Sequence, residues 1–159
     1  MIKHRKNIII NANIEKVWFF MIDFSRSLIF DTNYTLVELP TDYSVNHKLK
    51  FRVQAKYITK KIVLNGTVKE CYPPHNLSLH FINETGFSFN HFKIFKLKSM
   101  NDKTILEYTI NGDFNHFILN TFYGPVLKLK FNLELEYIKK AIESSENNIN
   151  TKKLQTMVK

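Results

Sequence analysis

The chain has 159 residues, 44% of them apolar and 23% charged, so it is long enough for one globular domain with a buried core. Its 23 basic and 14 acidic residues give a net charge of +9, which favours anionic partners, although the basic residues are spread out as on an ordinary soluble surface. The single cysteine, Cys71, excludes an internal disulfide, and the absence of metal-type Cys/His spacing predicts no metal site. We find no secretory or membrane-spanning segment and expect a protein of the reducing cytoplasm.

The first forty residues predict a strand, two short helices and a second strand. Residues 6–11 are rich in Ile and predict the strand, and Asn13 is a candidate N-cap for the first helix. From Ile14 to Ile22 the apolar positions repeat at helical spacing. A second short helix is predicted over residues 25–30, and a strand over 34–39 that Pro40 ends.

The middle of the chain predicts a run of antiparallel strands. Residues 48–57 alternate most clearly, because apolar side chains at odd positions from Leu49 to Tyr57 are separated by polar ones. This alternation predicts a sheet with one dry face and one wet face. Further strands are expected at residues 62–72 and 77–81, followed by a hairpin of residues 89–98 and 104–114.

The Asn65-Gly66 pair allows two interpretations. It could be a two-residue hairpin turn, but a turn here would leave one very long strand and one very short strand. We therefore predict a glycine bulge within one bent strand.

The chain after Phe114 predicts one long helix with a wide apolar face. One stripe at helical spacing contains Ile118, Phe122, Val126, Leu129, Leu133, Tyr137 and Ala141, and a second contains Leu127, Phe131, Leu135, Ile138 and Ile142. A helix of this extent would be about 40 Å long and could cover the dry face of the sheet. Residues 1–145 are expected to form the single domain, with 146–159 as a polar tail that frays.

This order of elements predicts an α+β fold in which a curved antiparallel sheet of about six to seven strands wraps around the C-terminal helix. Three segments resemble the START/SRPBCC (helix-grip) superfamily, most closely its polyketide cyclase/dehydrase and coenzyme Q-binding-like branch. These segments are Ile14-Glu15-Lys16-Val17-Trp18, the stretch 68–77, and Tyr123-Gly124-Pro125-Val126-Leu127, and the similarity extends over roughly residues 4–145. The resemblance implies a cavity between sheet and helix, gated near the short helices, that holds a lipid, sterol, polyketide, hormone or quinone.

The alternation along each strand and the helix stripe that begins at Ile118 identify the residues that would face such a cavity. The predicted ligand-binding residues are Phe51, Val53, Tyr57, Leu79, Phe81, His91, Lys93, Tyr108, Ile110, Phe122, Val126, Leu129 and Leu133. The register of residues 89–98 is open: if Phe95 and Leu97 point inward, so do His91 and Lys93, which could hold an anionic head group. Phe92 and Ile94 favour the opposite register, in which a bulge returns both polar side chains to solvent, and we prefer that interpretation.

The function predicted from these features is binding or carriage of a hydrophobic small molecule, without a cofactor, by a monomer or weak dimer. An alternative is a cyclase or dehydratase that uses a pocket acid/base residue, with His91 as the candidate, although no catalytic motif is present. A second alternative is transient binding of an anionic membrane through Lys48, Lys50, Arg52 and Lys56 on one strand face, and no specific nucleic-acid binding is expected. We expect a binding protein rather than an enzyme.

Overall fold

The computed structural model describes residues 1–156 except 32–33, 58–59, 84–88 and 115, and it does not describe the side chains of residues 57, 60 and 145–156. In chain order the elements are β1 (Ile2–Ile10), α1 (Ile14–Ile22), α2 (Phe24–Ser27), the 3-10 helix η1 (Leu28–Phe30), β2 (Tyr34–Glu38), β3 (Lys50–Tyr57), β4 (Lys60–Tyr72), β5 (Asn76–Ile82), β6 (Asn90–Met100), β7 (Lys103–Asp113) and α3 (Phe117–Thr156).

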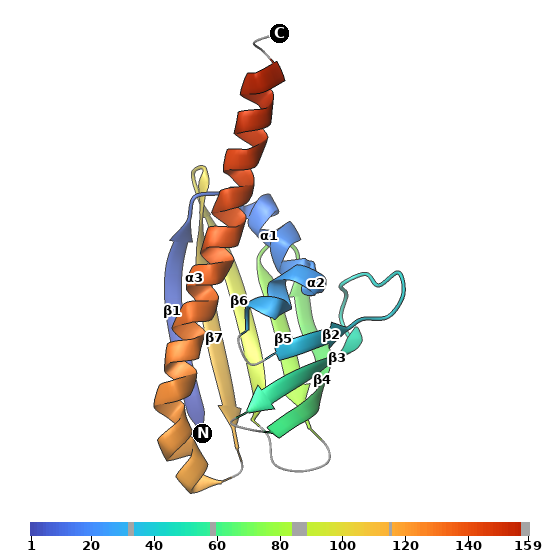
Figure 1. The fold of residues 1–159 in the computed structure, drawn as a ribbon, viewed down its shortest axis with the longest axis vertical. Helices are drawn as coiled ribbons and strands as arrows, with labels where there is room; N and C mark the ends of the chain where they lie inside the picture. The colour runs from blue at the N-terminus through green and yellow to red at the C-terminus, as the bar shows by residue number, and fades with distance from the viewer. Residues whose placement is uncertain (32–33, 58–59, 84–88, 115, 157–159) are drawn as a thin grey trace.

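The seven strands form one antiparallel sheet in the order β1-β7-β6-β5-β4-β3-β2. The sheet bends around α3, while α1 and α2 lie over the remainder of its inner face (Figure 1). The predicted alternation on β3 is confirmed, because Phe51, Val53 and Ala55 are buried while Lys50 and Arg52 are exposed. The α+β helix-grip architecture predicted from the order of elements is therefore correct.

The N-terminal elements follow from local signals. The Asn13 side chain accepts a hydrogen bond from the Lys16 amide at 2.9 Å and so caps α1, as predicted. Val17, Trp18 and Met21 on one side of α1 are buried in the core. This packing holds α1 and the following turns of α2 and η1 against the sheet and α3.

The helix α3 buries one of its two apolar stripes and exposes the other. Leu127, Phe131, Leu135, Ile138 and Ile142 are buried against the sheet. The stripe from Ile118 to Tyr137 lies on the opposite side of the helix, so the prediction that it also covers the dry face of the sheet is wrong. The polar segment after residue 145 continues α3 as far as Thr156.

The strand β4 runs unbroken through Asn65-Gly66, which confirms that this pair is not a hairpin turn. The bulge lies elsewhere than predicted, since the register with β5 shifts between Val68 and Glu70. Gly66 is required for a different reason: a Cβ atom there would lie 2.4 Å from the ring of Phe51. That ring is itself held between Phe24 and Phe81, with centroid distances of 5.1 and 5.7 Å.

We expect Gly66→Ala to lower the free energy of unfolding by about 1–3 kcal/mol, because the enclosed Phe51 ring cannot move away without strain. Adding Phe51→Leu should restore part of the loss. Gly124→Ala is the control, since its new methyl group would meet its nearest neighbour at 4.0 Å. Denaturant unfolding measures all three, and equal effects of the two alanine substitutions would contradict the close contact at Gly66.

Candidate functional site

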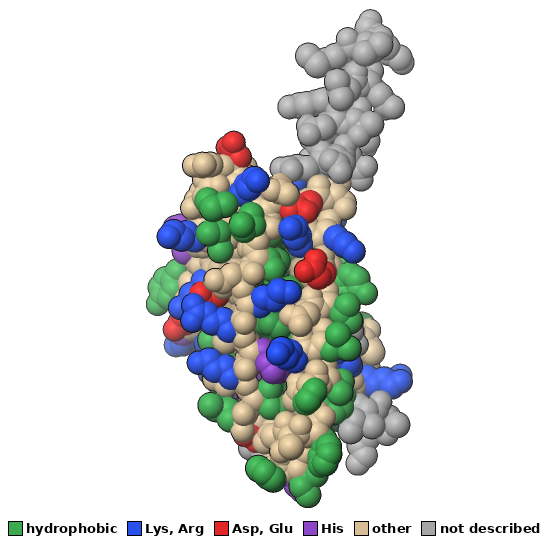
Figure 2. All heavy atoms as spheres, turned by 90° about the vertical axis from the view of Figure 1, so that its left-hand side faces the viewer, with side chains coloured by type: hydrophobic (Ala, Val, Ile, Leu, Met, Phe, Trp, Pro, Cys, Tyr) green, Lys and Arg blue, Asp and Glu red, His purple; other side chains and the backbone are tan. Residues whose placement is uncertain are grey.

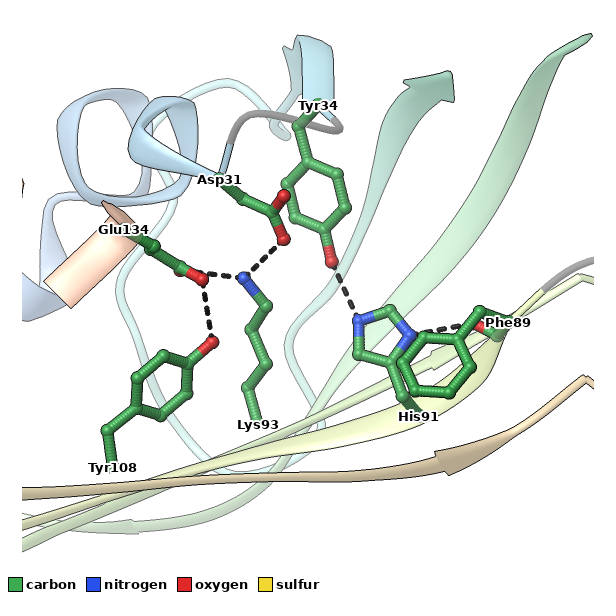
Figure 3. A network of polar contacts seen from close by, with 7 residues as sticks. All are labelled: Asp31, Tyr34, Phe89, His91, Lys93, Tyr108 and Glu134. Atoms are coloured by element: carbon green, nitrogen blue, oxygen red, sulfur yellow. Dashed lines mark hydrogen bonds and ion pairs between the residues drawn. The ribbon is translucent and has the colours of Figure 1, made fainter. Parts of the chain in front are cut away.

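A cluster of buried polar side chains lies between the sheet and α3 (Figure 3). Lys93 projects from the middle of β6 and is 0% exposed. Its Nζ atom donates to Asp31 Oδ2 at 2.7 Å and to Glu134 Oε1 at 2.8 Å. Asp31 follows η1 and Glu134 belongs to α3, so this ammonium group joins three separate elements of the fold.

Two tyrosines border the ion triad. The Tyr108 hydroxyl, from β7, donates to Glu134 Oε2 at 2.9 Å. The rings of Tyr34 and Tyr108 lie near the ammonium group, with Nζ 4.8 and 5.9 Å from their centroids. The cation therefore contacts carboxylates and aromatic faces and is shielded from water.

His91 lies beside the triad on the same face of β6. Its Nδ1 atom is 2.7 Å from the Phe89 carbonyl oxygen, which can only accept, so Nδ1 carries the proton. The Nε2 atom, 2.9 Å from the Tyr34 hydroxyl, then accepts from it. Phe81 and Phe89 stack on the imidazole at 4.9 and 4.8 Å between centroids. These contacts fix the ring as a neutral side chain.

Burial and charge shift the pKa values of three groups. Burial, together with the smaller effect of the Lys93 charge, lowers the pKa of His91 to about 4. For Lys93, burial acts to lower the pKa, but the two carboxylates outweigh it and the pKa is raised. Burial raises the pKa of Glu134 to about 7, opposed by Lys93 and assisted by the negative charge of Asp31. Near neutral pH, Lys93 is therefore an ammonium group, and the carboxyl group of Glu134 can exchange a proton.

Aromatic rings pack around the cluster. Phe95 stacks on Tyr108 at 4.5 Å, and Phe131 of α3 contacts the same tyrosine at 4.6 Å. A hollow of about 500 Å³ lies elsewhere. Its lining includes residues that alternate with the buried ones and so lie on the outer face of the sheet, namely Glu38, Lys50, Arg52, Asn65 and Thr67. A smaller hollow of about 310 Å³ lies between α1 and Ile142 of α3. Neither hollow is lined by Asp31, Lys93 or Glu134.

The strand residues predicted to face the interior do so: the buried ones are Phe51, Val53, Leu79, Phe81, His91, Lys93, Tyr108 and Ile110. The preferred bulge in residues 89–98 is wrong, because β6 pairs without a register shift and turns His91 and Lys93 inward. The side chain of Tyr57 lies outside the described part of the chain.

Four helix residues were placed wrongly: Phe122, Val126, Leu129 and Leu133 are exposed, at 76%, 41%, 62% and 39%. The reason is that Phe131 and Leu135 occupy the side of α3 that meets the sheet. Glu107 is on the outer face, opposite Lys96 and paired with Arg5.

Sequence reasoning missed Asp31, Tyr34 and Glu134. A signal for Glu134 exists, since it lies three residues after Phe131 and four before Ile138, on the stripe that is buried. Asp31 has no comparable signal, because its burial depends on how η1 packs over β6. In the described part of the chain, no group of three or more His, Cys, Asp or Glu side chains could hold a metal ion.

Comparison with known proteins establishes the fold. No protein-family model and no curated protein matches the chain. Among solved structures, a START superfamily protein from Mycobacterium smegmatis is 15% identical, covers 94% of this chain and 99% of its own, and has a TM-score of 0.68. A conserved protein from Geobacillus kaustophilus is 21% identical over 90% of this chain and 96% of its own, with a TM-score of 0.66. Ara h 8.0201 is 9% identical over 89% of this chain and 97% of its own, and it also has a TM-score of 0.66. The chain therefore has the same helix-grip fold as these proteins.

The shifted pKa values predict two opposite dependences of stability on pH. His91 binds fewer protons in the folded than in the unfolded chain between pH 4 and 6.5, so its contribution is lost on acidification. Glu134 binds more protons when folded between pH 4.5 and 7, so its contribution is lost as the pH rises. Each effect is about 3 kcal/mol, and between pH 4.5 and 6.5 they oppose each other.

We expect the His91→Gln variant to lose stability as the pH rises from 4.5 to 7, and the Glu134→Gln variant to lose it as the pH falls from 6.5 to 4. Denaturant unfolding at each pH, relative to the wild type, measures both slopes. Glu107→Gln is the control, because it removes one carboxylate from the outer face and leaves the interior unchanged. If both interior variants keep the wild-type profile, the two groups do not titrate as described.

Proposed function

We propose that the protein binds a hydrophobic small molecule between the sheet and α3, with the polar cluster around Lys93 as the anchor for its head group. The observation that carries this proposal is the burial of Lys93, Asp31 and Glu134 in the middle of an aromatic interior. A buried ion triad is seldom the most stable filling of a core, since apolar side chains of similar volume often stabilise a protein as well or better. Convergent polar groups with shifted pKa values in an apolar surrounding are typical of binding sites.

The charge of the cluster favours an uncharged head group. Lys93 already has two carboxylate partners, so an anion would have to displace one of them or add a further negative charge. A hydroxyl or carbonyl group can instead hydrogen-bond to Tyr108, Glu134 or Lys93 without changing the charge. Polyketides and quinones, which the sequence resemblance implies as ligands, carry groups of this kind. The anionic head group expected from the sequence is therefore replaced by a neutral one in the proposal.

Ligand access requires the closed interior to open. Asp31 belongs to the end of η1, and its contact with Lys93 holds this segment against β6. Separating η1 and α2 from the sheet would break that one ion pair while leaving Glu134 on Lys93. The short helices are thus the proposed gate, and the ligand would take space that aromatic rings now fill.

The test compares a long-chain alcohol with the fatty acid of the same chain length, using the fluorescence of the single tryptophan, Trp18, which is buried in the core. We expect the alcohol to bind more tightly. Tyr108→Phe, which removes one hydroxyl group, should weaken its binding about three- to tenfold. Tyr72→Phe, at a side chain 64% exposed, is the matched control.

Binding that is equal for the two head groups and unchanged by Tyr108→Phe would exclude the cluster as the anchor. Native mass spectrometry of the purified protein adds an independent result, since a retained apolar compound is expected. Failure to retain or bind any apolar compound would contradict the proposed function itself.

A second candidate function is acid–base catalysis on the bound compound by Glu134, whose pKa of about 7 suits proton transfer at neutral pH. His91 is the weaker candidate, because its pKa of about 4 and its two hydrogen bonds keep it neutral. Incubating a retained ligand with the protein and analysing it by mass spectrometry distinguishes the two functions. A carrier returns the compound unchanged, whereas an enzyme converts it and the Glu134→Gln variant does not.

A further inference from the structure

The outer side of α3 carries a continuous stripe of exposed apolar side chains. This outer stripe consists of Ile118, Phe122, Val126, Leu129, Leu133 and Tyr137, with exposures between 39% and 76%, and Phe117 at the start of the helix is 83% exposed. The spacing of three and four residues aligns them along about 28 Å of the helix. Hydrophobic side chains follow the α3 side of the molecule, at the right-hand edge of Figure 2.

The outer stripe is not needed to hold α3 in place. The opposite side of the helix is already buried through Leu127, Phe131 and Leu135. Single exposed apolar residues are common, but a row that follows one helix face is typical of an interaction surface. The charged side chains around the outer stripe indicate which kind of partner this face would bind.

The charged residues beside the outer stripe are two lysines and one glutamate. Lys130 lies three residues before Leu133, and Lys140 lies three residues after Tyr137, so both border the stripe. Glu136, three residues after Leu133, also borders it. The acidic residues of the described part of α3 are engaged with the rest of the protein. Glu134 binds Lys93, Glu136 lies 3.9 Å from Lys6, and Glu143 accepts from the Asn11 amide at 2.8 Å.

This pattern decides between two possible partners. A second copy of the chain would bring the same lysines to a symmetric interface, where like charges oppose association. An anionic lipid surface accepts an apolar stripe in its acyl boundary and places its phosphate and carboxylate groups beside the lysines. The net charge of +9 acts in the same direction.

We propose that the outer stripe of α3 lies flat on an anionic membrane surface, with Phe122 and Leu129 inserted among the lipids and Lys130 and Lys140 at the head groups. The protein would rest on the bilayer and not cross it: none of the described helices is long and apolar enough to span one. The proposal rests on the outside of α3 and holds whether or not the interior takes a ligand.

The test is flotation of the full chain with vesicles of phosphatidylcholine, with and without a minor fraction of phosphatidylserine. We expect binding only to the anionic vesicles, and its loss in high salt to be partial because the stripe also inserts. Phe122→Ser and Leu129→Ser should each weaken binding about fivefold or more. Lys130→Glu and Lys140→Glu should each weaken it about fivefold as well.

Val63→Ser is the matched control, since Val63 is 49% exposed and lies on the outer face of the sheet, away from α3. Arg52→Glu tests the basic strand face that the sequence suggested. The proposal is overturned if Arg52→Glu abolishes binding while the stripe variants do not, or if no vesicle is bound. It is also overturned if the protein sediments as a dimer that Leu129→Ser dissociates and vesicle binding is unaffected by that change.

Discussion

The ammonium group of Lys93, shared between two buried carboxylates, is the interaction on which the arrangement of this molecule depends. It lies in the middle of β6, and its partners come from the end of η1 and from α3, at 2.7 and 2.8 Å. A buried charge is tolerated only where it is paired and hydrogen-bonded, so the rotation of α3 and the position of η1 are both constrained by this one side chain. The rotation that brings Glu134 to Lys93 also turns Phe131 and Leu135 toward the sheet and the stripe from Ile118 to Tyr137 away from it.

The two sides of α3 therefore have different physical characters. The inner side combines aromatic packing with a polar cluster that contains one more carboxyl group than ammonium groups. The outer side is apolar and basic, and nothing in the described part of the chain covers it. A protein that takes up a water-insoluble compound needs both an interior that can accommodate it and a place where the compound is found. The proposed functions of the two sides are thus compatible, although each rests on its own residues.

Much of the fold could be predicted from the sequence, because period-2 alternation on β3 and helical spacing after Phe114 are local properties. The site was harder to predict. Parity with Phe95 and Leu97 places Lys93 on the inner face, whereas Phe92 and Ile94 favour the opposite register. The missing information was tertiary. The carboxylates that stabilise the buried Lys93 are on Asp31, after η1, and on Glu134 of α3, 62 and 41 residues away in the chain.

The two stripes of α3 show the same limit. Both have helical spacing and similar side chains, so periodicity cannot decide which one meets the sheet. Glu134 within the inner stripe could have been taken as a sign that this stripe is solvated, whereas it is buried because Lys93 lies opposite. The hydrophobic pattern therefore predicts the helix, whereas its orientation depends on tertiary contacts, among them that of Glu134 with Lys93.

The most direct test of this account is the titration of the Glu134 side chain, followed by carbon-detected NMR of its carboxyl group in the folded wild-type protein. A buried carboxyl group that shares Lys93 with Asp31 should titrate near pH 7, far above its ordinary value of 4.5. A pKa close to 4.5 would contradict this balance, in which burial and the charge of Asp31 outweigh the pairing of Glu134 with Lys93.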